Sequence, residues 1–199
     1  MTLEQGLAFF LFSVAAAGTP GPSNALLTAT GANVGVLRGL PALLGVAAGM
    51  GLMMFLVAFG LGSVILENPL VLTAVKWMGA AYLCWLAWKI ATAHRSSSGP
   101  SARPVGFLGA AAFQWINPKS WLVCASAAAT FLDQRSGSAL GQSVAISLTF
   151  VLAAVPSCFP WLAFGALMQR LLHSDRALRT FNIAMAALLA ASVILIFVR

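Results

Sequence analysis

Two polar interruptions lie within long apolar stretches of the sequence. The first is Thr19-Pro20-Gly21-Pro22-Ser23-Asn24, near the middle of residues 6–34, and the second is Asn117-Pro118-Lys119, near the centre of residues 105–131. Proline lacks a backbone N–H and clashes with the carbonyl four residues back, so each interruption frees polar backbone groups. A membrane tolerates such groups only where protein or a water-filled cavity surrounds them.

The first interruption has the chemistry of an anion site. Residues before proline avoid the α region, so a first half-helix should end near Gly18, and Pro22 suits the first position of a new helix with Gly21 as its cap. The N–H groups then left free are those of Ser23, Asn24 and Ala25. They lie at the positive end of a helix, which is a natural site for a carboxylate. The alternative is a proline kink needed only for packing; two polar residues directly after Pro-Gly-Pro favour a site.

Lys119 is the second candidate. It lies about 18 Å from the end of its apolar stretch at 1.5 Å per residue, beyond easy snorkelling. No acidic residue lies deep in any apolar stretch. Its partner is therefore either half-helix carbonyls, such as those that Pro118 frees, or the carboxylate of a substrate, and the sequence leaves both open. Gln114 and Trp115 precede this interruption and are candidates to face the same pathway.

Composition indicates which elements must position these residues. The chain has 199 residues, of which 60% are hydrophobic and 8% charged, whereas a soluble domain has about 25% charged residues. Six apolar stretches each exceed the roughly 20 residues that a bilayer requires. They are residues 6–34, 40–65, 70–92, 105–131, 140–168 and 177–198. We expect an all-α integral membrane protein with six transmembrane helices. The N-terminus is not expected to be a cleavable signal peptide, because it lacks a basic n-region and carries Glu4.

The net charge of +7 carries information about topology. Seven basic residues flank loops one, three and five: Arg38, Lys89, Arg95, Arg103, Arg170, Arg176 and Arg179. By the positive-inside rule these loops are cytoplasmic and both termini lie outside. Because the basic excess is accounted for in this way, we expect no nucleic-acid partner.

The two halves of the chain are predicted to be inverted repeats. Three apolar stretches precede the polar linker 94–104 and three follow it, so the second half enters the membrane in the opposite orientation. We expect a single transmembrane domain over residues 1–199, with repeat one at about 1–93 and repeat two at about 105–199. Helices one and four would then be broken at the midplane. Paired interruptions of this kind point to the substrate site of a secondary transporter.

Other residues favour structural roles. Glycines recur every fourth residue at Gly31, Gly35 and Gly39, and again at Gly45 and Gly49, a spacing that permits close helix contact or dimerisation. Two prolines in residues 156–160 should bend the fifth stretch. Trp85, Trp88 and Lys89 are typical of an interfacial belt.

The sequence offers no enzymatic site. We expect both histidines and both aspartates of the chain to lie in loops: His94, His173, Asp133 and Asp175. The three cysteines, Cys84, Cys124 and Cys158, are scattered over three stretches. A membrane electron carrier for disulfides would require a reactive cysteine pair, and the sequence has no C-x-x-C motif. We therefore expect no catalytic residue, metal or cofactor.

The motifs resemble those of the LysE/RhtB amino-acid exporters. They are Thr19-Pro20-Gly21-Pro22-Ser23-Asn24, the Gly31, Gly35 and Gly39 ladder, Gly79-Ala80-Ala81-Tyr82-Leu83 with Leu86-Ala87-Trp88-Lys89, and Phe113-Gln114-Trp115-Ile116-Asn117-Pro118-Lys119. Residues 79–91 look closest to the branch that includes cysteine and O-acetylserine exporters. The resemblance implies proton-driven efflux of amino acids or their derivatives across a bacterial inner membrane by a homodimer.

One departure from the family pattern bears on the substrate. Members often carry Asp or Asn directly after Pro-Gly-Pro, where this chain has Ser23 followed by Asn24. Without that carboxylate, a cationic substrate is disfavoured. A neutral or thiol-bearing amino acid fits better, with its carboxylate near Lys119 or the second half-helix.

These observations predict a secondary exporter of small amino acids in contact with membrane lipid. The candidate substrate-binding residues are Pro20, Gly21, Pro22, Ser23, Asn24, Gln114, Asn117, Pro118 and Lys119. The alternative is a membrane redox or scaffold protein without transport activity. The missing cysteine pair argues against redox chemistry, and the midplane interruptions argue against a pure scaffold.

Overall fold

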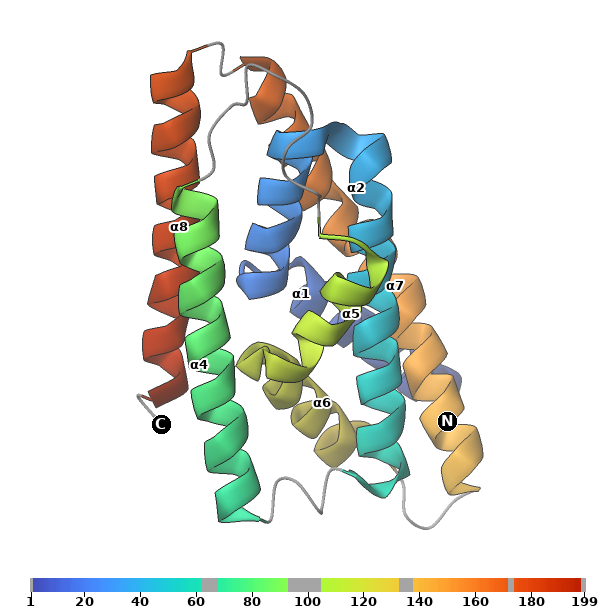
Figure 1. The fold of residues 1–199 in the computed structure, drawn as a ribbon. Coiled ribbons are helices and arrows are strands. Elements are labelled where there is room, and N and C mark those ends of the chain that lie inside the picture. Colours follow the sequence, from blue (N-terminus) through green and yellow to red (C-terminus); the bar gives the residue numbers. More distant parts are fainter. Residues whose placement is uncertain (1, 62–67, 93–104, 133–137, 172–173, 198–199) are drawn as a thin grey trace.

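The computed structural model describes residues 2–61, 68–92, 105–132, 138–171 and 174–197. Every regular element within these ranges is a helix (Figure 1), as the sequence predicts. The elements are α1 (Leu3–Gly18), α2 (Pro22–Leu56), the short π-helical turn η1 (Val57–Leu61), α4 (Pro69–Ala91), α5 (Phe107–Ile116), α6 (Pro118–Phe131), α7 (Ala139–Leu171) and α8 (Asp175–Phe197). The predicted linker 94–104 lies outside the described residues.

Helix α2 contains a sharp reversal. Gly35 has φ 77° and ψ −179°, a backbone conformation that favours glycine because it has no Cβ. The chain rises through residues 22–34, crosses the top of the bundle and descends through the rest of α2 (Figure 1). The first and second apolar stretches are thus joined by a turn so tight that the two helices form one element.

The glycine spacing brings helix backbones together. A Cβ on Gly165 of α7 would collide with the carbonyl oxygen of Thr28, and one on Gly31 would collide with that of Leu162. In the same way Gly45 would meet the backbone of α5. The consequence is that α2 packs extensively against α7 and α5, while α4 packs against α8. Most of these glycines therefore make contacts within the chain.

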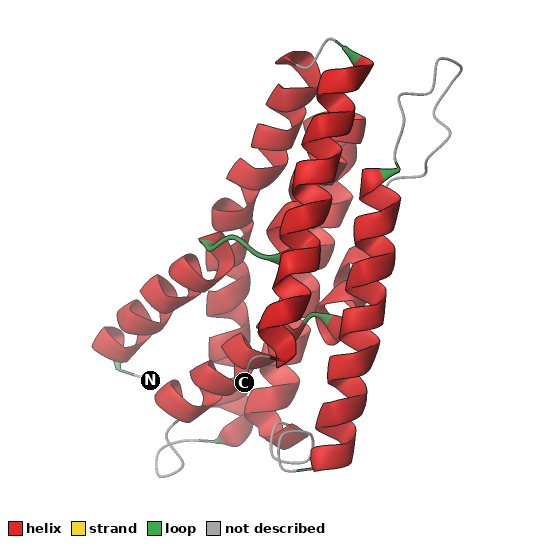
Figure 2. Ribbon diagram, turned by 90° about the vertical axis from the view of Figure 1, so that its left-hand side faces the viewer, coloured by secondary structure: helices red, strands yellow, loops and turns green. Residues whose placement is uncertain are grey.

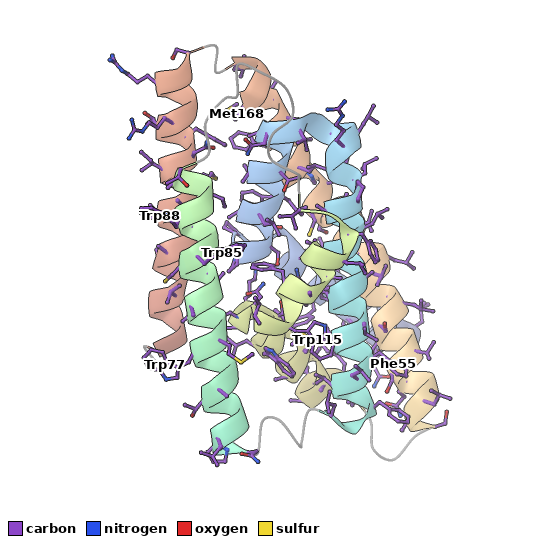
Figure 3. The ribbon with its side chains drawn as sticks, in the orientation of Figure 1. Phe55, Trp77, Trp85, Trp88, Trp115 and Met168 are labelled. Carbon is purple, nitrogen blue, oxygen red and sulfur yellow. The ribbon has the colours of Figure 1, made fainter. Side chains whose placement is uncertain are left out.

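The surface of the bundle is apolar and part of its interior is polar. Large side chains such as Leu3, Leu37, Leu70 and Trp88 are 70–90% exposed. Trp77, Trp85 and Trp88 of α4, which Figure 3 labels, are 49–70% exposed. The buried polar residues are Ser13, Asn24, Thr28, Thr30, Gln114, Asn117, Ser120, Ser143 and Asn182. Soluble monomers rarely expose so much contiguous apolar surface, whereas a protein in lipid must.

Within the described residues, two helical stretches are each long and apolar enough to cross a bilayer, Pro22–Leu61 and Ala139–Met168, fewer than the six that the sequence predicts. Helices α1 and α5 are also apolar but shorter, because each ends at a proline-bearing junction. Figure 2 shows these two junctions as loops near mid-height, away from both ends of the bundle. Helix α7, in contrast, continues through Pro156 and Pro160 without interruption.

Candidate functional site

The first junction leaves the start of α2 open. Helix α1 ends at Gly18, and Thr19 is extended, as a residue before proline should be. Pro22 is the first residue of α2, Gly21 is its cap, and no side chain caps this end. The N–H groups of Ser23 and Asn24 therefore point out of the helix without intrahelical partners.

The prediction of three free N–H groups is wrong for Ala25. Its N–H donates to the carbonyl oxygen of Gly21 at 2.9 Å. Ala25 is the first residue of α2 that can reach a carbonyl four residues back, so it closes the first turn of the helix. The open donors at this end are two rather than three.

Side chains from other helices satisfy the carbonyl end of α1. Asn24 Nδ2 donates to the carbonyl oxygens of Ala17 and Thr19, both at 2.8 Å. Trp161 Nε1 of α7 donates to the carbonyl oxygen of Gly18 at 3.1 Å. The negative end of α1 and the positive end of α2 thus face the same small region from either side of the junction.

Lys119 connects the two junctions. It belongs to α6, and its Nζ donates to the carbonyl oxygen of Thr19 at 2.6 Å. Its aliphatic part passes over Gly21, where a Cβ would lie 2.9 Å from Lys119 Cδ. Of the two partners that the sequence left open, a half-helix carbonyl is the one in contact. This bond uses one of three ammonium hydrogens, and Lys119 also lines the cavity described below.

The second junction is closed by its own residue. Asn117, in extended conformation, separates α5 from α6. Its Oδ1 accepts from the Lys119 N–H at 3.1 Å, and its carbonyl oxygen accepts from the Ser120 N–H at 3.0 Å. The start of α6 is therefore capped, and of these two junctions the first is the one that leaves a helix start uncapped.

A buried polar network joins the junctions. Asn117 Nδ2 donates to Ser23 Oγ at 3.0 Å, and Ser23 Oγ donates to Gln114 Oε1 at 2.9 Å. Ser120 Oγ donates to the same Gln114 oxygen at 3.0 Å, and Gln114 Nε2 donates to the carbonyl oxygen of Ala110. Residues more than 90 positions apart are thereby held in one hydrogen-bonded cluster.

A small cavity lies against this cluster. The candidate residues that line it are Gly21, Ser23, Asn24, Gln114, Asn117 and Lys119. Pro20, Pro22 and Pro118 are not among its lining residues; they set where the helices stop and start. The free volume is about 30 Å³, room for about one water molecule. An amino acid is larger than this volume.

Sequence reasoning missed part of this lining. Ser120 directly follows Lys119, and its place in the first turn of α6 was the available signal. The apolar wall comprises Ala16, Ala17, Val46, Met50, Val123, Phe150 and Ala154. Cys158, which is not among the candidate site residues predicted from the sequence, also lines the cavity, and its Sγ lies 3.6 Å from the carbonyl oxygen of Ala17. Trp115 is not a lining residue; its carbonyl oxygen accepts from Trp121 Nε1 (Figure 3 labels Trp115).

Comparison with known proteins adds an independent observation. Residues 14–197 match the family model described as LysE type translocator. The chain is 32% identical over 190 residues to proteins named cysteine/O-acetylserine efflux protein from Escherichia coli (strain HS), Shigella sonnei and Shigella flexneri. The alignment covers 96% of this chain and 96% of each relative. No solved structure matches the chain.

Proposed function

Because the chain belongs to the LysE type translocator family, we propose that it is a secondary transporter that exports small neutral amino acids or their derivatives from the cytoplasm. A translocator moves its substrate across the membrane without changing it, so the chain is not an enzyme. The names of the efflux proteins that it resembles over nearly its whole length support an amino-acid substrate.

One observation carries the assignment of the site: the uncapped start of α2 and the side chain of Lys119 line the same cavity. The substrate carboxylate would accept from the N–H groups of Ser23 and Asn24, where the helix dipole favours an anion. Lys119 Nζ would add a charge-assisted hydrogen bond from the other side. The capped start of α6 makes the second half-helix a poorer choice than the sequence suggested.

The lining favours a neutral substrate with a short side chain. No Asp or Glu is among the residues that line the cavity in the described part of the chain. A cationic side chain would therefore lack a counter-charge. Met50, Phe150 and Cys158 form an apolar and polarisable wall, which suits a thiol or an ester group better than an ammonium. Cysteine and O-acetylserine meet these conditions.

The architecture that fits this function is six spans in one domain over residues 1–199, built as two inverted repeats of three. The support is the likeness of the junctions: α2 and α6 both begin with proline after an extended residue, and both junctions lie at mid-height (Figure 2). We place both junctions near the membrane midplane. The contact between α4 and α8, the third helices of the two halves, is consistent with this pairing.

We further propose that both termini face outward from the bacterial inner membrane. Arg38 beside the Gly35 turn is exposed, as are Arg176 and Arg179 near the start of α8. The crossing segment of α2, the end of α7 and the start of α8 lie at the same end of the bundle, while α1 begins and α8 ends toward the other (Figure 1). Export would be driven by proton exchange and carried out by a homodimer embedded in lipid.

Efflux from cells tests this proposal. Cells that overproduce the chain should release cysteine and O-acetylserine faster than cells with the gene deleted. Replacing Pro20-Gly21-Pro22 with three alanines should join α1 to α2 and pair the open N–H groups within one helix. Efflux should then collapse although the protein still accumulates in the membrane. Unchanged efflux by this variant at equal protein amount would show that the junction is only a kink needed for helix packing.

A further inference from the structure

The amide of Asn24 has a fixed orientation. Its Nδ2 donates to two carbonyl oxygens, those of Ala17 and Thr19, each at 2.8 Å. The reverse orientation would place Oδ1 against both carbonyl oxygens, where acceptor would face acceptor. The two donated bonds therefore decide which atom of the amide is left over.

The atom left over is a buried acceptor. Asn24 is 2% exposed, and its Oδ1 has no hydrogen-bond donor among the described residues. Buried polar atoms are nearly always paired, and each exception calls for an explanation. Asn24 lines the cavity at the junctions, so a group bound there that reached this oxygen would supply the missing donor.

The surroundings of this oxygen select a cationic donor. The amide that carries it is bonded through Nδ2 to the carbonyl end of α1, where the helix dipole is negative and favours positive charge. An ammonium group already binds this end of α1, because Lys119 Nζ donates to the same Thr19 carbonyl oxygen that Asn24 contacts. A carboxylate, which carries only acceptors, could not pair with Asn24 Oδ1.

We propose that Asn24 Oδ1 accepts a hydrogen bond from the α-ammonium group of the substrate. This inference rests on the proposed function and completes it: the first junction binds a zwitterion by its two opposite helix ends. The carboxylate lies at the open N–H groups of α2 and near Lys119. The ammonium lies at Asn24 Oδ1, on the side of the carbonyl end of α1.

The test compares cysteine with 3-mercaptopropionate, which has the same thiol and carboxylate but no ammonium. Each compound competes with labelled cysteine for uptake into vesicles containing the reconstituted protein. The wild type should prefer cysteine. Asn24→Ala should reduce this preference about ten- to hundredfold, as expected for the loss of a charge-assisted hydrogen bond. If Asn24 only supported the fold, its substitution would weaken the binding of both compounds equally.

Thr28→Val is the matched control. Thr28 is fully buried one turn further along α2, donates to the Asn24 carbonyl oxygen and does not line the cavity. It should leave the preference unchanged. If Asn24→Ala does not accumulate, Asn24→Ser serves instead, because its hydroxyl is too short to reach the position of Oδ1 and the preference should fall similarly.

The outcomes separate this inference from the proposed function. Cysteine transport by a wild type that does not prefer cysteine to 3-mercaptopropionate would overturn the ammonium site alone. An unchanged preference in the Asn24 variants would do the same. Failure of the wild type to transport cysteine, O-acetylserine or any other neutral amino acid would overturn both proposals.

Discussion

Lys119 has two proposed roles, structural and substrate-binding, that its observed contacts do not separate. Its ammonium binds the Thr19 carbonyl oxygen and so stabilises the negative end of α1. The same group lines the cavity beside the open start of α2, where a substrate carboxylate would be attracted to it. A structural lysine would affect every substrate alike, whereas a binding lysine would affect only those with a carboxylate.

Lys119→Met should therefore act selectively. Methionine keeps an unbranched apolar stem but removes the charge, so the affinity for cysteine should fall about ten- to hundredfold. The affinity for cysteamine, which lacks the carboxylate, should change little. Lys119→Arg should recover part of the affinity for cysteine because the charge survives with a different geometry. The measurement is competition against labelled cysteine in vesicles with equal amounts of folded protein.

Equal losses for cysteine and cysteamine would identify Lys119 as a structural tie between the junctions. Wild-type affinity for both compounds would remove it from the site altogether. In either case the carboxylate would have to be bound by the α2 N–H groups without help from this lysine.

At the scale of helices, proline chemistry predicts the end of α1 near Gly18, the start of α2 at Pro22 and the interruption at residues 117–119 from local sequence. The same reasoning fails for Ala25, because which N–H groups stay free depends on where the first intrahelical bond closes. It also misses the cap on α6, because the sequence does not reveal that Asn117 Oδ1 accepts a hydrogen bond from the Lys119 N–H. Local rules locate the helix ends, and hydrogen bonds between side chain and backbone decide which end is open.

The close crossing of α2 and α7 depends on glycines, which have no side chain, at the points of contact. A Cβ on Gly165 would collide with the backbone of Thr28, which cannot move without shifting α2. Gly165→Ala should therefore lower the free energy of unfolding by about 1–3 kcal/mol, as overpacking does. The midpoint of thermal unfolding in detergent measures this loss.

Gly6→Ala is the control for that experiment. Gly6 lies in α1, and a Cβ there would meet nothing within 4 Å. Alanine should leave stability unchanged or raise it by about 0.5–1 kcal/mol, because glycine is a poorer helix former. Equal behaviour of the two variants would show that α2 and α7 do not rely on this close approach.

At the scale of the molecule, composition and hydropathy predict an all-helical membrane protein, and the exposed leucines and tryptophans agree. Which helices meet was not predictable in detail. The network from Ser23 to Gln114 and Asn117 spans sequence separations of more than 90 residues, and no local pattern encodes such a pairing. The likeness of the two interruptions was the one sequence signal that pointed to it.

The orientation of the molecule makes a prediction of its own. If the basic residues mark cytoplasmic loops, the segment 94–104 lies in the cytoplasm. A reporter that is active only in the cytoplasm should therefore be active when it is inserted after Ser98. At the N-terminus, a reporter that is active only outside the cytoplasm should be the active one. Activity of an externally active reporter after Ser98 would reverse the proposed orientation.

The central claim is that the substrate binds where the two junctions meet. Substrate protection tests it most directly, in a transport-competent variant whose three native cysteines are replaced. Ser23→Cys in that background should react with a hydrophilic thiol reagent, and saturating O-acetylserine should slow the reaction several-fold. Ser138→Cys, at the exposed start of α7, should react at the same rate with or without O-acetylserine. Labelling of Ser23→Cys that O-acetylserine does not slow, in protein that still transports it, would contradict the account.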